Sequence, residues 1–232
     1  MIRAITLDLD DTLWPIAPVI ERAELAVHDY FLRHCPTVAE RFPVAGMRAL
    51  RERIAEQHPQ LSHDFSAQRR LSLRAALDAC AAPHDHLEPA FEAFYSARNQ
   101  VELYPDSEAA LQQLAALFPL AALTNGNADL GRIGLAGLFR FNLGAREHGA
   151  AKPVASIFLT ACQRLNTRPE HTLHVGDDPW LDVAGAQAAG LRSCWINRHN
   201  ASWPTELARP DWEIESLHQL LPLLHPDQAD CA

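Results

Sequence analysis

An apolar run over residues 4–9 is interrupted by carboxylates where the run ends. The run predicts a short buried strand. Asp8 and Asp10 are separated by one residue, so on an extended backbone both side chains point to the same side. Two carboxylates this close repel each other when both are ionised, and burying either one without a partner is costly. We therefore expect a cation, a shared proton or a chemical task at the end of this strand.

From about residue 18 to residue 100 the apolar positions recur with a helical period, and we find no convincing strand. Prolines punctuate the joins between the helical segments. Helices are predicted over residues 19–34, 46–57, 66–81 and 87–99. This stretch is therefore predicted to be an all-helical insert.

Beyond residue 101, strand and helix patterns alternate. Strands are predicted over residues 120–124, 139–143, 172–176 and 193–197, with an edge strand over 211–214. Helices are predicted to start at 105–107 and at Pro153, and to cover 182–189 and 215–224. Residues 200–210 are predicted to be loop, and the tail after Pro226 to be disordered. Such alternation predicts a parallel sheet with helices on both faces.

These patterns together predict an α/β protein. Its core is a Rossmann-like, doubly wound parallel sheet, into which an all-helical domain is inserted. The sheet domain is predicted to comprise residues 1–16 and 102–232, and the helical domain residues 17–101.

Composition narrows the class of protein. Apolar residues make up 48% of the chain, which is enough for a packed core. The formal net charge of −9 argues against a nucleic-acid binder, which needs a basic face. Five scattered cysteines without a CxxC pair indicate reduced thiols. No segment resembles a signal peptide or a membrane span of roughly 18 apolar residues, so we expect a soluble, cytoplasmic protein without membrane contact.

Unusual polar residues stand at the ends of three predicted strands and beside a predicted helix start. They are Asp8-Leu9-Asp10, Thr124-Asn125, Gly176-Asp177-Asp178 and Lys152-Pro153. In open α/β sheets, ligands bind outside the carboxyl ends of the strands. Carboxylates, a hydroxyl and an ammonium on one edge suit a hard divalent cation and a phosphate. Magnesium is typically bound in this way, through one or two carboxylates plus the substrate phosphate.

Each of these groups also has a structural interpretation. Carboxylates after a strand can be turn or cap residues, and Asn125-Gly126 is a common turn pair. A lone lysine is usually solvated, and a carboxylate pair before Pro179 fits a helix cap. The joint order and position of the groups favour a functional site over four unrelated structural roles.

The motifs resemble those of the haloacid dehalogenase superfamily, in its phosphatase branch. The matching residues, in order, are Asp8-x-Asp10-x-Thr12, Thr124, Lys152-Pro153 and Gly176-Asp177-x4-Asp182. The helical insert between the first and second motifs resembles the type 1 cap of that superfamily. The resemblance covers residues 5 to about 197 and is specific, because all four motifs occur in order at suitable spacing.

A narrower resemblance is to the bacterial flavin mononucleotide (FMN) phosphatases, which also dephosphorylate 5-amino-6-(5-phospho-D-ribitylamino)uracil in riboflavin biosynthesis. The stretches that carry it are residues 4–13, 123–127 and 173–178, with 194–197 and His63-Asp64 in addition. It implies a Mg²⁺-dependent phosphomonoester hydrolase for FMN or that uracil derivative. Another sugar or nucleotide phosphate is the alternative substrate.

The resemblance also implies a role for each motif residue. Asp8 is the expected nucleophile, which forms an aspartyl-phosphate, and Asp10 is the expected general acid and base. The Asp8 carboxylate, the backbone carbonyl of Asp10 and the Asp177 carboxylate are the expected Mg²⁺ ligands. Thr124 and the amide of Asn125 are expected to bind phosphate oxygens.

The remaining motif residues are expected to support the nucleophile, the metal ligands and the phosphate-binding groups. Lys152 supplies a fixed positive charge, and Asp182 orients Lys152 or a metal-bound water. Asp178 has two interpretations, support of the metal site or a helix cap alone. Trp14 also has two, stacking on a flavin or pyrimidine ring and packing in the core or against the cap. The other expected substrate-binding residues are Thr12, Gly126 and His148.

Two expectations concern the cap. Arg69, Arg70 and Arg74 lie on one predicted cap helix, where they either steer anions or form a solvated face. The cap is expected to close over the site and exclude water, with hinges near residues 14–18 and 101–104.

Other functions remain as alternatives. Haloalkanoic acid dehalogenases share the nucleophile but lack an acid at the plus-two position and need no metal, so Asp10 favours phosphoryl chemistry. A phosphonatase needs a cap lysine, and residues 18–100 contain none. A phosphomutase would isomerise its substrate, and a catalytically silent domain would only bind phospho-ligands. The expected partner is a small phosphorylated molecule, and the expected state a monomer or homodimer.

Overall fold

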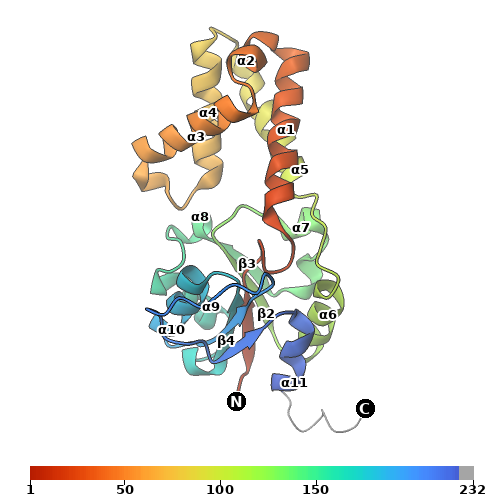
Figure 1. Cartoon of the computed structure of the whole chain (residues 1–232), viewed down its shortest axis with the longest axis vertical. Coiled ribbons are helices and arrows are strands. Elements are labelled where there is room, and N and C mark those ends of the chain that lie inside the picture. The colour runs from red at the N-terminus through yellow and green to blue at the C-terminus, as the bar shows by residue number, and fades with distance from the viewer. Residues whose placement is uncertain (225–232) are drawn as a thin grey trace. The chain divides into compact units, whose positions relative to one another are not determined.

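The computed structural model describes residues 1–224 (Figure 1). By their internal contacts these residues divide into two units. The first, called here the sheet unit, comprises Met1–Pro15, Glu102–Gly126 and the chain from Ile133 onward. The second, the helical unit, comprises Ile16–Val101 and Asn127–Arg132. The tail after Pro226, predicted to be disordered, lies outside the described residues.

Among the described residues, six parallel strands form one sheet in the order β3-β2-β1-β4-β5-β6. The strands are β1 (Ala4–Leu7), β2 (Leu120–Thr124), β3 (Phe141–Gly144), β4 (Thr172–Gly176), β5 (Arg192–Ile196) and β6 (Trp212–Ile214). Because β2 and β3 extend the sheet on one side of β1 and β4 to β6 on the other, the strand order reverses beside β1. Ligands of doubly wound sheets bind at this reversal. The structure confirms the predicted fold class.

The central strands are continuous apolar runs, as expected for a parallel sheet that is covered on both faces. Every residue of β1, β2 and β4 is buried. Leu7 is in register with Ala122 on one side and with Val175 on the other. The three strands therefore end at a similar level, and the side chains that follow them meet at one edge of the sheet.

Helices cover both faces of this sheet. They are α6 (Ser107–Leu117), α8 (Ala145–His148), α9 (Ala155–Arg164), α10 (Gly185–Ala188) and α11 (Leu220–Leu224), with α7 (Leu130–Ile133) spanning the boundary between the units. Helices α9 and α10 lie on one side of the sheet, and α6 and α11 on the other (Figure 1). Ile157 and Phe158 of α9 pack in one cluster with Leu123 of β2 and Leu143 of β3.

Three helix boundaries in the sheet unit differ from the predicted ones. Helix α9 begins after Pro153, because Val154 is still extended (φ −62°, ψ 122°). The helix predicted over residues 182–189 begins earlier. It starts as a π-helical segment, η5 (Pro179–Ala184), which continues into α10. The closing helix predicted over 215–224 is shorter, because a capping box at Ser216 starts η6 (Leu217–Gln219) before α11. Two further single turns are η3 (Ala136–Leu138) and η4 (Pro169–His171).

The helical unit is built from five helices of the described chain. They are α1 (Ile16–His34), α2 (Pro36–Arg41), α3 (Val44–Gln57), α4 (Phe65–Ala79) and α5 (Leu87–Arg98), with the turns η1 (Pro59–Leu61) and η2 (His84–His86). Helix α1 packs along α5 and α3 along α4, and their core includes Phe31, Leu50 and Leu77. Helix α2 was not predicted, because six residues are too few to display a period.

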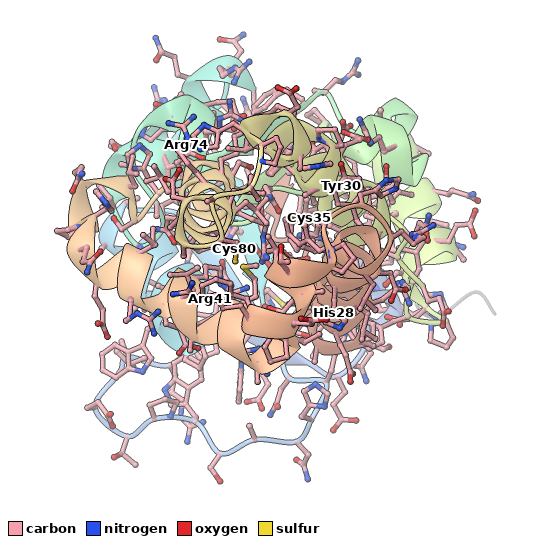
Figure 2. The ribbon with its side chains drawn as sticks, turned by 90° about the horizontal axis from the view of Figure 1, so that it is seen from above. His28, Tyr30, Cys35, Arg41, Arg74 and Cys80 are labelled. Atoms are coloured by element: carbon pink, nitrogen blue, oxygen red, sulfur yellow. The ribbon has the colours of Figure 1, made fainter. Side chains whose placement is uncertain are left out.

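The structure shows the state of the cysteines and the character of the helices. The cysteines of residues 1–224 are free thiols, and Cys35 and Cys80 of the helical unit (Figure 2) both contact Thr37. No helix within residues 1–224 combines the length and the apolar character that crossing a membrane requires.

Candidate active site

The loop after β1 carries the first predicted site residues. Asp8 follows the strand directly, and its backbone N–H still donates to the carbonyl of Val175 on β4 (2.9 Å). Asp11 adopts a left-handed conformation (φ 58°), which its short polar side chain tolerates and which turns the chain. The N–H of Leu13 then donates back to the carbonyl of Leu9 (2.8 Å). The loop is therefore closed by its own backbone and presents Asp8 at the edge of the sheet.

Trp14 lies in the core, so of its two predicted roles the structure supports packing over stacking on a substrate ring. Its side chain is fully buried. Its indole N–H donates to Oδ1 of Asp10 (2.8 Å), as buried indoles usually do to some acceptor. Trp14 therefore fixes the orientation of the Asp10 carboxylate.

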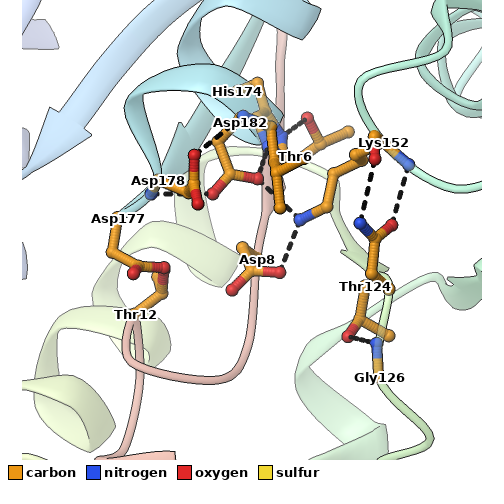
Figure 3. A network of polar contacts seen from close by, with 12 residues as sticks. Thr6, Asp8, Thr12, Thr124, Gly126, Lys152, His174, Asp177, Asp178 and Asp182 are labelled. Atoms are coloured by element: carbon orange, nitrogen blue, oxygen red, sulfur yellow. Dashed lines mark hydrogen bonds and ion pairs between the residues drawn. The ribbon is translucent and has the colours of Figure 1, made fainter. Parts of the chain in front are cut away.

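Lys152, the only lysine in the chain, is buried between two carboxylates. Its Nζ lies 2.5 Å from Oδ1 of Asp8 and 2.6 Å from Oδ1 of Asp182 (Figure 3). Its backbone is held by Asn125: the Lys152 N–H donates to Oδ1 (2.8 Å), and the Lys152 carbonyl accepts from Nδ2 (3.0 Å). This reciprocal pair joins the loop after β2 to the segment before α9 and so positions the ammonium.

Asp182 is buried, and both of its oxygens are hydrogen-bonded. Besides Lys152, Oδ1 contacts Nε2 of His174 (3.0 Å), and Oδ2 accepts the backbone N–H of Asp178 (3.1 Å). Nδ1 of His174 is bonded in turn to Oγ1 of Thr6 on β1 (2.8 Å). A continuous polar chain therefore runs from β1 through β4 to the ammonium of Lys152 (Figure 3).

The end of β4 presents Asp177 and requires a glycine beside it. A Cβ atom at Gly176 would lie 2.2 Å from Cγ of Asp182, so no side chain fits there. Oδ1 of Asp177 accepts the hydroxyl of Thr12 (3.2 Å), and its backbone carbonyl accepts the indole N–H of Trp195 (2.7 Å). Thr12, predicted to bind substrate, is thus engaged with the Asp177 carboxylate.

Asp178 caps the helical turn that follows β4. Its Oδ1 accepts the backbone N–H groups of Trp180 (2.8 Å) and Leu181 (2.9 Å). Only its own backbone N–H reaches Asp182. Of the two predicted interpretations of the Asp178 side chain, the structure therefore supports the helix cap.

One ammonium faces three carboxylates at this edge. Oxygens of Asp8, Asp177 and Asp182 all lie within 4.8 Å of one another. Burial raises the pKa of Asp8 well above its usual value; Lys152 opposes this rise, while Asp182 and Asp177 add to it. Burial and the neighbouring Asp182 raise the pKa of Asp177 to about 7. Burial acts in the same direction on Asp182, but Lys152 and His174 outweigh it and lower the pKa of Asp182.

The charge balance leaves room for a cation. Burial disfavours the ammonium of Lys152, but Asp182 and Asp8 more than compensate and raise its pKa. Burial lowers the pKa of His174, which keeps that ring neutral. Lys152 contacts both Asp8 and Asp182 but carries one positive charge, so it cannot neutralise all three carboxylates. Because both oxygens of Asp182 are already bonded, Asp8 and Asp177 are the carboxylates that fit a divalent cation.

The loop after β2 is folded by a local hydrogen bond. Thr124 is buried, and its hydroxyl accepts the backbone N–H of Gly126 (2.9 Å). The side chain of Asn125 is bound to the backbone of Lys152, so this turn and the lysine are held together (Figure 3). The structure therefore brings the predicted residues after β2 into one network with Lys152.

His148 lies in a different setting. It ends α8, and its Nε2 is 2.8 Å from Oγ of Ser156 near the start of α9. The described residues show no hydrogen bond between His148 and the carboxylate cluster. Its role in substrate binding stays a prediction.

Three residues that the sequence analysis missed support the site: His174, Trp195 and Arg198. Arg198 donates through Nε to the carbonyl of Thr12 (2.9 Å) and through Nη1 to Oδ1 of Asp106 (2.9 Å). It thereby holds the loop after β1 from outside. Of these three, only His174 could have been identified from the sequence. A lone polar residue inside a fully buried strand must find a hydrogen-bond partner.

Comparison with known proteins agrees with this geometry. The haloacid dehalogenase-like hydrolase family matches residues 2–190. The chain is 35% identical to the 5-amino-6-(5-phospho-D-ribitylamino)uracil phosphatase YigB of Escherichia coli, over 96% of each chain. It is 29% identical to a glyceraldehyde 3-phosphate phosphatase of Methanopyrus kandleri, over 95% of this chain and 96% of that one.

A solved structure is also similar over almost the whole length. It is described as a 2-haloacid dehalogenase from Pseudomonas syringae pv. Tomato, with a TM-score of 0.91, 39% identity, and coverage of 97% of this chain and 99% of that one. The chain belongs to the haloacid dehalogenase-like hydrolase family. Within that family it is an enzyme of the phosphatase type, as are the two curated relatives named above.

Proposed function

We propose that this enzyme hydrolyses phosphate monoesters through an aspartyl-phosphate on Asp8. The observation that carries the proposal is the buried cluster in which one lysine faces three carboxylates beside the oriented acid Asp10. Lys152 binds Oδ1 of Asp8, which leaves Oδ2 as the attacking oxygen. A nucleophile held in this way needs little reorganisation to react.

The proposed reaction has two steps. An Asp8 oxygen forms a bond to phosphorus while the ester P–O bond breaks, and Asp10 gives its proton to the leaving alkoxide. Water then attacks phosphorus, Asp10 takes up its proton, and the bond from phosphorus to Asp8 breaks to release inorganic phosphate. Thr124 and the backbone amide of Asn125 are proposed to hold the phosphate oxygens, and the buried charge of Lys152 to attract them.

Mg²⁺ is the proposed cofactor. The carboxylates of Asp8 and Asp177 fit it, together with the backbone carbonyl of Asp10. When bound, it would offset the repulsion between the carboxylate cluster and an anionic phosphate. The fixed contacts of Asp177 to Thr12 and Trp195 would hold this ligand in place before the ion binds.

The proposed substrate is FMN or 5-amino-6-(5-phospho-D-ribitylamino)uracil. The full-length match to the E. coli phosphatase named for the uracil derivative supports this assignment. Other sugar or nucleotide phosphates are the alternative within the same chemistry. A screen of phosphorylated metabolites with Mg²⁺, ranked by kcat/KM, tests the assignment, and a clearly higher value for an unrelated sugar phosphate would overturn it.

Dehalogenation is the second candidate, because the similar solved structure is described as a 2-haloacid dehalogenase. Asp10, two residues after the nucleophile and held by Trp14, favours phosphoryl transfer, which needs a proton donor for the alkoxide. Assays of halide release from 2-chloropropionate and of phosphate release from FMN separate the two. We expect phosphate release only, and halide release without phosphate release would reverse the assignment.

The roles of the two acids are tested by substitution. Asp8→Asn removes the nucleophile, and Asp10→Ala removes the proton donor, so each should lower phosphate release by at least roughly 10³-fold. Asp129→Asn, on an exposed carboxylate of the helical unit, serves as the control and should retain activity. Full turnover by Asp8→Asn would exclude the mechanism, and an inert wild-type protein would point to a silent phospho-ligand-binding domain.

A further inference from the structure

A cavity of about 660 Å³ lies in the sheet unit, at the edge of the sheet where the strands begin. Arg3 lines it directly before β1, and His171 lines it directly before β4. The label N in Figure 1 marks this edge. Asp8 and Asp177 follow the opposite ends of the same two strands. The cavity is therefore separate from the carboxylate cluster.

The lining of this cavity is basic, although the chain as a whole has a formal net charge of −9. Arg3, Arg168 and His171 line it, and within residues 1–224 no carboxylate does. Glu170 pairs with Arg168 from outside the lining, with Oε1 3.5 Å from Nη1. Positive charge that is gathered around a hollow raises the local concentration of anions. The charge of the lining therefore favours an anionic ligand.

Two buried polar atoms of the lining residues have no hydrogen-bond partner within residues 1–224. They are Oγ1 of Thr167 and Nδ1 of His171. Leaving such atoms unpaired is costly, so buried polar groups are normally bonded to protein, to ordered water or to a ligand. Exposed arginines occur on any protein surface and are solvated there. The two unpaired buried atoms are therefore what distinguishes this cavity from an ordinary basic patch.

The backbone around the cavity is fixed by its own hydrogen bonds. The N–H of Thr167 donates to the carbonyl of Cys162 on α9 (3.0 Å). The N–H of His171 donates to the carbonyl of Arg168 (3.0 Å), and the N–H of Arg3 donates to the carbonyl of His171 (2.8 Å). The end of α9, the turn η4 and the start of β1 are thus joined. A lining that is formed before the ligand arrives lowers the cost of binding.

We propose that this cavity binds a phosphate monoester of a small polyhydroxylated metabolite. Guanidinium groups bind phosphate oxygens through paired, charge-assisted hydrogen bonds. Gln163, Asn166 and Thr167 bring amide and hydroxyl groups to the same lining, and these match the hydroxyl groups of a sugar. A volume of about 660 Å³ is that of a small-molecule site and exceeds what a bare phosphate ion fills. Free phosphate is the other source of the same chemistry.

Calorimetric titration of ribose 5-phosphate in the presence of a chelator tests the site, because binding is then measured without Mg²⁺. Arg3→Gln removes a charged donor from the lining, so the Kd should rise at least roughly tenfold. Arg140→Gln is the matched control. Arg140 is an exposed arginine that stands directly before β3, as Arg3 stands before β1, but it does not line the cavity. Its substitution should change the Kd less than about twofold.

A second variant tests the unpaired hydroxyl. Thr167→Val keeps the shape of the side chain and removes Oγ1, so the Kd for ribose 5-phosphate should rise roughly fivefold or more. The ligand-free Tm should stay equal or rise, because an unpaired buried polar atom is lost. Equal affinity in wild type, Arg3→Gln and Thr167→Val would overturn the proposal. Absence of binding to wild type would overturn it as well.

Two further titrations separate this site from the other sources of phosphate binding. Inorganic phosphate should bind more weakly than ribose 5-phosphate, and equal affinity would reassign the cavity to the free ion. Asp8→Asn should bind ribose 5-phosphate as wild type does. Binding that depends on Asp8 and not on Arg3 would place the ligand in the carboxylate cluster and overturn the proposal.

The site and the proposed hydrolysis can fail separately, because they share no side chain. Binding that depends on Arg3 in a protein that hydrolyses no phosphate ester would refute the function and keep the site. Hydrolysis by a protein in which Arg3→Gln binds ribose 5-phosphate as wild type does would refute the site and leave the function standing.

Discussion

At the scale of single residues, Trp14 is buried and bonded to Asp10, so in the proposed mechanism it acts on the chemistry without contacting a ligand. Its position beside the loop after β1 allows ring stacking, but the indole is buried and holds Oδ1 of Asp10. If Asp10 is the proton donor, as proposed, this hydrogen bond orients the donor and leaves substrate binding unchanged. Losing it should therefore affect turnover more than affinity.

Trp14→Phe tests this distinction, because phenylalanine keeps an aromatic ring in the core but cannot donate to Asp10. We expect kcat to fall roughly tenfold with KM changed less than about twofold, measured as phosphate release from FMN. Trp203→Phe, at another buried indole whose N–H donates to the carbonyl of Leu207, is the control and should change neither constant. A higher KM with unchanged kcat would indicate ring stacking on the substrate.

Residue patterns predicted the carboxylates and the lysine of the site, because charged side chains at strand ends are conspicuous. The residues that form hydrogen bonds with these carboxylates were harder to predict. Asp182 is bonded to His174, and Asp177 to Trp195, over contacts that only the folded sheet creates. The burial of Arg69 against the ring of Phe94 could not be predicted either, since Phe94 lies on a different helix, α5.

At the scale of elements, the pattern predicted long segments well and short ones poorly. The bounds of β2 and β4 agree with the predicted runs, because a buried parallel strand is a continuous apolar stretch. Helix α2 is not predicted by the pattern, since it depends on Pro36 at its start. The π-helical segment η5 begins before the predicted helix at residue 182, at the Pro179 start that the cap interpretation of Asp178 allows. The pattern predicts a helix start at Pro153, yet the chain remains extended through Val154.

Helices α1 and α3 are joined by an ion-pair clamp, in which Glu24 binds Arg48 and Arg51. Burial acts to raise the pKa of Glu24, but the two arginines outweigh it and lower that pKa below its usual value. The clamp therefore contributes stability above the unfolded-state pKa of about 4.3. That contribution is lost as the pH falls through the lower pKa of the folded state.

Glu24→Gln should accordingly lower the free energy of unfolding by about 1–2 kcal/mol at neutral pH, since the arginines are partly exposed. The difference from wild type should shrink below about pH 4. Urea unfolding across this pH range measures both. Glu88→Gln, at the exposed pair with Arg70, is the control and should cost less than about 1 kcal/mol. A pH-independent difference would contradict the clamp.

At the scale of the whole molecule, the change from helical period to strand–helix alternation predicted an inserted helical unit. By contacts, the helical unit also includes Asn127–Arg132, which the sequence pattern assigned to the sheet domain. Side-chain contacts bind this segment to the helical unit: Asn99 accepts the backbone N–H of Asp129, and Arg132 forms an ion pair with Glu92. The local pattern of apolar and polar residues does not reveal such contacts between distant parts of the chain.

The sheet unit gathers more carboxylate charge than Lys152 neutralises, so Mg²⁺ should bind and stabilise the folded state. We expect Mg²⁺ to raise the Tm of wild type, and a chelator to abolish phosphate release until Mg²⁺ is restored. Asp177→Asn should remove the Mg²⁺-dependent rise in Tm. The exposed variant Asp129→Asn should retain it. An equal rise in Asp177→Asn would place the ion elsewhere.

The central claim is that Asp8 carries the phosphoryl group during turnover. The most direct measurement is mass spectrometry of enzyme that is mixed with FMN and Mg²⁺ and quenched in acid within one turnover. We predict one phosphoryl group, labile to base, on the peptide that contains Asp8, and none in Asp8→Asn. Rapid release of inorganic phosphate with no label on that peptide, or with the label on another residue, would contradict the account.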